Sequence, residues 1–388
     1  MIQKHPTGEW RIKCLVPDLP SPEAVIPYLY EMSDNRWYAN FGPINGRFEE
    51  ACKKLLTTDG QTCFVSSFSS ATAAMEVVLV AKGLERGAKV LVPSLTFPAT
   101  ALAVIRSGYE PVLSDIDPDS YQLTPEIAKA CLAKSGGEDI AAVVPVAPYG
   151  IPVDIDAWED FQVATGVPVL VDAAAAFPVQ KPGRTIPVVY SLHATKPFGI
   201  GEGGLVACGE PAVIEKARLL SNFGFEHYEI VTPGSNAKMG EYYAAVGLVQ
   251  LARREELEAR RAHLWQKYCD VFAGASDKVH IIGSAGYSGG YSGGTVAIPA
   301  NLLIETKVPI QKVVDACITK SIQTRHWYLP PLHSQQAFAS CLQLGDGEKG
   351  LPLVADRLMQ HMTGLPFHNF LSDDDIEEVA AVVLKATI

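Results

Sequence analysis

The sequence of 388 residues lacks several features that would assign it to a particular class of protein. No stretch of 18 apolar residues occurs, and the first residues lack the apolar core of a signal peptide, so we expect a cytoplasmic protein with no membrane partner. Lysine and arginine form no extended run, and the formal net charge is -11. We therefore expect no nucleic-acid partner, whereas a small anionic ligand could bind through local donors.

Paired cysteines are missing as well. The eight cysteines are scattered and none forms a C-x-x-C pair, which argues against a zinc ribbon or a dithiol redox site, and we expect no metal. Scattered cysteines in a chain of this length are typical of reduced, buried thiols. The composition is 48% hydrophobic and 19% charged, as in a folded globular protein with one large domain or two smaller ones.

The chain does contain a regular alternation of two patterns between residues 71 and 208. Short valine-rich runs predict strands at residues 89–93, 111–115, 141–146, 168–172, 188–191 and 204–208. Helical patterns occupy residues 71–83, 99–107, 125–134 and 155–165. This alternation indicates an α/β fold with a mostly parallel sheet that helices cover on both faces. Ligands of such sheets bind at the carboxyl ends of the strands, where Asp115, Asp172 and Ser191 lie.

The rest of the chain suggests a second domain. Residues 240–272 predict one long helix, and its charged cluster at 253–261 has the spacing of a solvated helix that joins two domains. A glycine- and serine-rich patch at 283–294 fits either a plain loop or a loop that faces a substrate. We predict a large domain with an N-terminal arm over residues 1–250 and a smaller α+β domain over residues 251–388.

Lys196 lies between an apolar run at 186–191 and a glycine-rich turn at 201–204. An amine held at the end of a buried strand can have a lowered pKa, and a neutral amine can form a Schiff base with a carbonyl compound. The alternative is an ordinary solvated lysine in a surface loop. The sequence around Lys196 therefore suggests a nucleophile, and the assignment depends on the other elements of the chain.

Four other elements suit a flat, anionic ligand. Residues 70–72 precede a helix, whose start can bind an anion or can simply be capped by a serine. Asp172 ends an apolar strand and needs a partner if it is buried, unless it caps the next turn. Phe97 follows another strand, so its ring could stack on a planar ligand or belong to the core. Ser191 ends the strand before Lys196 and offers a second hydroxyl donor.

In this order and spacing, the elements resemble those of pyridoxal-phosphate enzymes with the aspartate-aminotransferase fold, and more closely the DegT-type sugar aminotransferases. The resemblance runs over nearly the whole chain. Strings at residues 37–49, 70–72, 93–100, 112–117, 149–156, 191–204, 236–247 and 327–333 carry it. It implies fold type I, which has a mostly parallel seven-stranded sheet flanked by helices and a smaller C-terminal α+β domain.

The resemblance also implies an enzyme with pyridoxal 5'-phosphate as its cofactor. Lys196 would bind the cofactor covalently and move protons, and Asp172 would keep the ring nitrogen protonated. The implied cofactor-binding residues are Ser70, Ala71, Thr72, Phe97, Asp172, Ser191, Lys196 and, from a second copy of the chain, Asn236. The residues expected to contact the substrate are His326, Tyr328 and His333, although the two histidines fit a hydrogen-bonded position at a domain seam equally well.

The implied reaction transfers an amino group, with L-glutamate as the expected donor, to a nucleotide-linked 3- or 4-keto-6-deoxyhexose. A site completed by a second copy implies a homodimer. Ala147, Ala175 and residues 237–238 depart from the residues usual in the family, which leaves the sugar open. Two alternatives remain: a lyase or desulfurase reaction of the same cofactor, in which Cys341 would be the reactive thiol, and a non-catalytic regulator that binds the cofactor.

Overall fold

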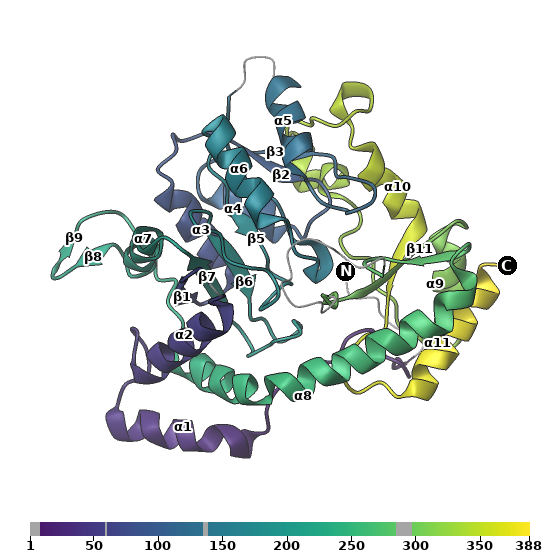
Figure 1. Cartoon of the computed structure of the whole chain (residues 1–388), viewed down its shortest axis with the longest axis horizontal. Coiled ribbons are helices and arrows are strands. Elements are labelled where there is room, and N and C mark those ends of the chain that lie inside the picture. Colours follow the sequence, from purple (N-terminus) through teal and green to yellow (C-terminus); the bar gives the residue numbers. More distant parts are fainter. Residues whose placement is uncertain (1–7, 59, 135–138, 285–296) are drawn as a thin grey trace.

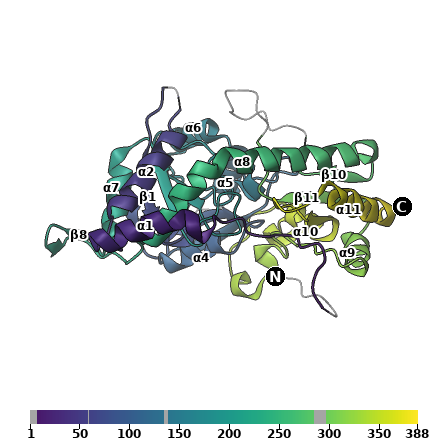
Figure 2. The same cartoon turned by 90° about the horizontal axis from the view of Figure 1, so that it is seen from below.

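The computed structural model describes residues 8–58, 60–134, 139–284 and 297–388. Its main feature is a large α/β lobe and a smaller lobe that share one long helix, α8 (Glu241–Phe272) (Figure 1). This helix packs against α1 (Pro22–Asn35) and α2 (Pro43–Leu56) at one end and against α11 (Asp373–Ala386) at the other, as the view from below also shows (Figure 2). The long helix predicted at 240–272 is confirmed.

The large lobe contains a sheet of seven strands in the order β1-β7-β6-β5-β4-β2-β3. The strands are β1 (Phe64–Phe68), β2 (Lys89–Pro93), β3 (Glu110–Ser114), β4 (Ile140–Val143), β5 (Val171–Asp172), β6 (Val188–Ser191) and β7 (Gly204–Cys208). Parallel bridges from Val143 to Val169 and from Val146 to Asp172 join the four strands on one side to the three on the other. Only β7 runs antiparallel to its neighbours, so the predicted mostly parallel sheet is confirmed.

Helices cover both faces of this sheet, because successive residues of a strand point to opposite sides. In β2, Leu91 belongs to the core beneath α2, α5 (Pro125–Lys134) and α6 (Ile155–Thr165). Its neighbours Val90 and Val92 belong to the core beneath α3 (Ala71–Ala81), α4 (Ala99–Arg106) and α7 (Pro211–Ser221). The valine-rich strands are therefore buried on both sides, which is why their sequence shows no polar alternation.

Two strands differ from the sequence pattern. The first, β1, was not among the predicted strands, because Ser66 and Ser67 interrupt its apolar residues. Both serines are fully buried, and the backbone N–H and the hydroxyl of Ser67 donate to the Glu49 carboxylate. The second is β5, which has only two residues where the pattern predicted five, since the residues before Val171 make a single bridge to β4.

The smaller lobe has an antiparallel sheet of β10 (Val279–Ile281), β11 (Leu302–Thr306) and β12 (Met362–Leu365). The helices α9 (Ile310–Thr319) and α11 pack on it together with the end of α8, and α10 (Leu353–His361) lies against β11. The predicted boundary at residue 250 falls inside α8 and stays a prediction. Most of the glycine- and serine-rich patch lies outside the described residues.

Two short elements complete the large lobe. The strands β8 (Phe225–Glu226) and β9 (Glu229–Ile230) form a hairpin that projects from the end of α7 (Figure 1). Within the described part of the chain, no helix is both long and apolar enough to cross a membrane.

Candidate active site

A cavity of about 580 Å³ opens where β4, β5 and β6 end, and residues of the smaller lobe close its other side. It brings together eight of the predicted site residues. These are Ser70, Ala71, Thr72, Phe97, Asp172, Ser191, Lys196 and Tyr328. Residues more than 250 positions apart in the sequence therefore line the same cavity. This cavity lies at the edge of the sheet where ligands were predicted to bind.

Lys196 lies in a turn that is fixed by backbone hydrogen bonds. Its N–H donates to the His193 carbonyl at 2.8 Å, and a Cβ on Gly199 would lie 2.7 Å from the Ala194 oxygen, so the turn closes only with glycine there. Burial lowers the pKa of the Lys196 amine, whereas the negative charge of Asp172 acts in the opposite direction. Burial thus favours the neutral, nucleophilic form of this amine more than in a solvated lysine, which is the direction that the sequence suggested.

Asp172 is a buried carboxylate with two donors. Thr100 Oγ1 donates to its Oδ2 at 2.7 Å, and the Ala174 N–H donates to its Oδ1 at 3.0 Å. Burial raises the pKa of Asp172, and these two hydrogen bonds together with the positive charge of Lys196 counteract the rise. Asp172 and Lys196 both line the cavity, and no ion pair joins them in the described structure.

The start of α3 forms another wall of the cavity. Ser70 caps this helix by accepting a hydrogen bond from the Ala73 N–H at 3.1 Å, so the capping role considered for it is real. The first N–H groups of a helix have no partner inside it, and those of Ala71 and Thr72 belong to this set. A Cβ at position 204 would lie 2.5 Å from the Ala71 nitrogen. Gly204 therefore lets β7 approach the helix start closely.

Aromatic rings lie on the side of the smaller lobe. Phe97 is 60% exposed, so it is not a core residue, and its ring meets the edge of Tyr328 at 6.2 Å between centroids. Tyr328 stacks on Tyr149 at 5.1 Å with an angle of 10° between the ring planes. The predicted stacking residue thus borders the cavity, and Tyr328 is held by the buried Tyr149 behind it.

Other predicted residues lie elsewhere. His333 is buried and its Nε2 bonds to Asp356 Oδ1 at 2.7 Å, which matches the alternative of a hydrogen-bonded histidine; neither it nor His326 lines the cavity. Asn236 is exposed and accepts a hydrogen bond from Lys238 Nζ at 2.9 Å. Cys341 also lies outside the cavity, and burial raises the pKa of its thiol.

The strand-end Asp115 does not take part in the site. Its carboxylate accepts hydrogen bonds from the N–H groups of Val354 and Ala355 in the first turn of α10. Asp115 and Asp172 carry the same sequence signal, an aspartate after an apolar strand, yet one caps a helix and the other faces the cavity. Only the packing of the two lobes separates these outcomes.

The sequence did not single out several residues that border the cavity. Thr100 was noted only as part of the loop around Phe97, and Arg325 precedes the Trp327-Tyr328 string without a pattern of its own. His193 and Glu202 lie on the wall beside Lys196. The Thr195 N–H donates to His193 Nδ1 at 3.2 Å, so this nitrogen is an acceptor and the ring proton of neutral His193 is on Nε2.

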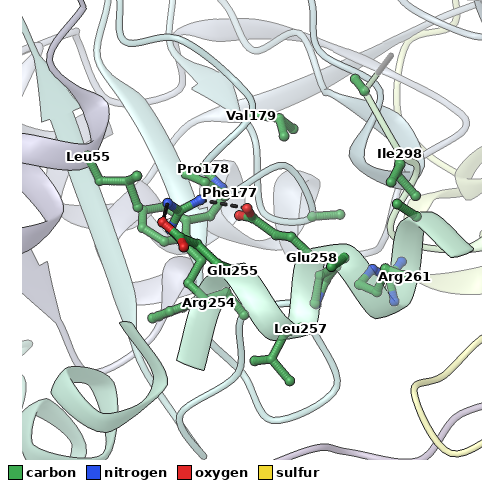
Figure 3. Close-up of a pocket in the computed structure, with 16 residues that line it drawn as sticks. Leu55, Phe177, Pro178, Val179, Arg254, Glu255, Leu257, Glu258, Arg261 and Ile298 are labelled. Carbon is green, nitrogen blue, oxygen red and sulfur yellow. Dashed lines mark hydrogen bonds and ion pairs between the residues drawn. The ribbon is translucent and has the colours of Figure 1, made fainter. Parts of the chain in front are cut away.

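A second cavity of about 560 Å³ is lined in part by residues of α8, among them Arg254, Glu258 and Arg261 (Figure 3). Ala175 borders both cavities. Its charged side chains already have partners. Arg254 donates to Glu258 Oε2 at 2.6 Å, and Arg261 donates to the carbonyl oxygens of Pro299 and Ala300. Apart from its charged side chains, the residues of its wall are apolar. The described wall of this second cavity therefore includes neither a helix start that could bind an anion nor a nucleophilic side chain.

A family model described as the DegT/DnrJ/EryC1/StrS aminotransferase family matches residues 22–384. The chain belongs to this family. The predicted aminotransferase activity and the cofactor pyridoxal phosphate are thereby confirmed, and so is the fold.

Three known proteins are similar to this chain along almost their full length. The dTDP-4-amino-4,6-dideoxy-D-glucose transaminase of Shigella dysenteriae is 27% identical over 95% of this chain and 96% of its own. A Bacillus cereus structure described as a candidate PLP-dependent aminotransferase superposes with a TM-score of 0.86 at 26% identity, covering 96% of this chain and 99% of that one. The structure of DesI with its TDP-sugar product gives 0.81 at 26% identity, over 99% and 95% of the two chains.

Proposed function

We propose that this protein transfers the amino group of L-glutamate to a nucleotide-linked 3- or 4-keto-6-deoxyhexose, with pyridoxal phosphate bound in the large-lobe cavity. The observation that carries the proposal is the placement of a half-buried lysine, Lys196, and a buried carboxylate, Asp172, in one cavity with the start of α3. The choice of sugar is supported by the Shigella relative, whose name specifies a dTDP-linked amino sugar, and by the TDP-sugar bound to DesI.

The residues present fit the cofactor. The first turn of α3, with Ser191 beside it, would hold the phosphate group, and the close approach allowed by Gly204 shapes that cradle. Asp172 would face the ring nitrogen, and the half-exposed Phe97 would cover one face of the ring. Each of these sites corresponds to one chemical part of the cofactor.

Pyridoxal phosphate supplies an electron sink next to the carbon that exchanges its proton. The chain's own residues do the rest. Because burial lowers the pKa of Lys196, its amine can accept the proton from the donor carbon in the first half-reaction, and in the second half-reaction the protonated amine can deliver a proton to the sugar carbon. Hydrogen bonds from Thr100 and Ala174 favour the ionised form of Asp172 and counteract the effect of burial, and a negative charge there would favour a proton on the ring nitrogen.

L-Glutamate should aminate the cofactor in the absence of any sugar, because Lys196 and Asp172 are sufficient for the first half-reaction. We expect the visible absorbance band of the cofactor-loaded protein to be replaced by the ultraviolet band of the aminated cofactor within a single turnover. A stopped-flow spectrum measures this directly. A spectrum that stays unchanged with glutamate, glutamine, aspartate and alanine would exclude the transferase and favour the non-catalytic regulator.

Thr100→Val should shift the acidic limb of the pH–activity profile to higher pH. Without the hydroxyl donor, burial raises the pKa of Asp172 further, so less of the carboxylate is ionised at a given acidic pH. We expect the rate at the acidic end to fall by about tenfold and the free energy of unfolding by about 1–2 kcal/mol.

The matched control for this variant is Thr185→Val. Thr185 Oγ1 donates to the buried Glu159 carboxylate at 2.6 Å, outside the cavity. This control should lose similar stability but keep the wild-type pH profile. If both profiles coincide with that of the wild type, the hydrogen bond from Thr100 does not tune Asp172.

The proposal includes a homodimer in which Asn236 reaches the cofactor phosphate of the other copy. Its support is that Asn236 lies outside the cavity of its own chain, on an exposed segment. Large apolar side chains are exposed nearby in the hairpin, including Tyr228 at 98% and Ile230 at 62%. A protein that sediments as a monomer at micromolar concentration would contradict this part of the proposal.

A further inference from the structure

We infer that Arg325 anchors the carboxylate of the amino donor, an inference that rests on the proposed transamination. Arg325 lines the same cavity as Lys196 and Asp172 but comes from the smaller lobe. It makes no ion pair with any carboxylate in the described structure, and burial leaves its Nε without a hydrogen-bond partner. A buried guanidinium donor without a partner is costly, and a bound anion would supply the missing acceptor.

The fold holds Arg325 in place. Its N–H donates to the Gly364 carbonyl at 3.0 Å, and its carbonyl accepts from the Gly364 N–H at 2.7 Å. A Cβ at position 364 would lie 2.5 Å from the Trp327 ring, so glycine makes room for this ring. The guanidinium carbon of Arg325 lies 5.5 Å from the centroid of Trp327. An arginine that rests on an indole is oriented before the ligand arrives.

Several other arginines in the described part of the chain pair with carboxylates. Arg218 donates to Glu49 at 2.7 Å, and Arg357 pairs with Glu305. Arg325 differs because its charge faces a cavity and lacks a protein carboxylate. The planar guanidinium presents parallel N–H donors whose spacing matches the two oxygens of a carboxylate.

The donor's carboxylate fits better than the diphosphate of a sugar nucleotide. The α-carboxylate of an amino acid is one carbon away from the amine that reacts, and Arg325 shares the cavity of about 580 Å³ with Lys196. Along the described wall, Arg325 is the one guanidinium, Lys196 is an amine whose pKa burial lowers, and Asp172 and Glu202 are carboxyl groups. A single arginine matches one carboxylate, whereas a diphosphate next to Glu202 would be repelled.

The test compares Arg325→Gln with Arg325→Lys and with Arg357→Gln, an arginine outside the cavity. Titration calorimetry with glutarate, which has the carboxylates of glutamate but no amine, measures binding to the cofactor-loaded protein without turnover. We expect Arg325→Gln to weaken glutarate binding and the glutamate half-reaction by about 10- to 100-fold. Arg325→Lys should recover part of this loss, and Arg357→Gln should bind like the wild type.

Thymidine diphosphate is the second probe, and its affinity should be the same in Arg325→Gln and the wild type. Weaker thymidine diphosphate binding with unchanged glutarate binding would assign Arg325 to the sugar nucleotide and overturn the inference. Equal glutarate binding by the wild type and Arg325→Gln would overturn it as well. If glutarate binding depends on Arg325 but no amino donor changes the cofactor spectrum, the anchor stands and the proposed transamination fails.

Discussion

Lys196→Ala should abolish amino transfer, with a loss of at least about 10,000-fold in the turnover rate, while the protein still folds. The same amine is proposed to bond to the cofactor and to move the proton, so no second group can replace it. Folding disfavours the protonated form of this buried amine, because burial lowers the pKa of Lys196 below its ordinary value. Removing it therefore relieves an electrostatic cost that offsets part of the lost packing, and the melting temperature of the cofactor-free protein should stay within a few degrees of the wild-type value.

Lys82→Ala is the control for a buried lysine as such. Lys82 follows α3 and has a pKa that burial also lowers, but it does not line the cavity. Its variant should keep the visible band of the bound cofactor and most of the activity. The Lys196 variant should lose that band. Turnover at the wild-type rate by Lys196→Ala, measured by product formation, would show that the nucleophile is another residue.

The sequence predicted the part of the site that depends on local geometry. Lys196 was recognised because an apolar strand and a glycine-rich turn enclose it, and both features lie within ten residues of it. The start of α3 was recognised for the same reason, since small residues and a serine precede a helical pattern. In each case, the neighbours in sequence are also the neighbours in space.

Residues whose role depends on distant contacts could not be predicted in this way. Thr100 matters because it reaches Asp172, which is 72 positions away, and nothing near Thr100 in the sequence indicates that contact. Arg325 faces the cavity only because the smaller lobe packs against the sheet. For His333 the sequence left a substrate contact and a hydrogen-bonded position equally open, and the packing places its ring on Asp356.

The fold shows the same division. Strands with continuous valine runs were predicted with nearly correct ends, because burial on both faces leaves a clear pattern. β1 was missed because two serines interrupt its apolar residues, and the partner of the buried Ser67 is Glu49, a residue of another element. Polar residues inside a strand weaken its apolar pattern in the sequence even when a residue distant in the sequence supplies their hydrogen-bond partner.

Asp172→Asn should retain the cofactor and slow amino transfer by about 1,000-fold or more. Asparagine has nearly the same shape, so the variant should still fold. Its amide oxygen can accept the Ala174 N–H, and its NH₂ group can donate to Thr100 Oγ1, which also shares a hydrogen bond with Thr96 at 2.8 Å. A neutral amide cannot hold a proton on the ring nitrogen, and single-turnover kinetics with glutamate would show the loss.

Asp115→Asn is the matched control, because Asp115 also ends a strand but caps α10. It should lose stability and keep the activity per folded molecule.

The expected change in the free energy of unfolding has the opposite sign at Asp172. Burial raises the pKa of Asp172, so folding disfavours its ionised form, and this cost grows as the pH rises above the ordinary aspartate pKa. Cofactor-free Asp172→Asn should therefore be at least as stable as the wild type at neutral pH.

The charge on the ring nitrogen can be separated from the shape of residue 172. A cofactor analogue methylated on that nitrogen carries a permanent positive charge and needs no carboxylate to keep it. If Asp172 acts by holding the proton, this analogue should restore much of the activity of Asp172→Asn but not that of Lys196→Ala. If Asp172 acts only by packing against Thr100 and Ala174, the analogue should restore nothing. Wild-type rates in Asp172→Asn with the natural cofactor would refute both roles.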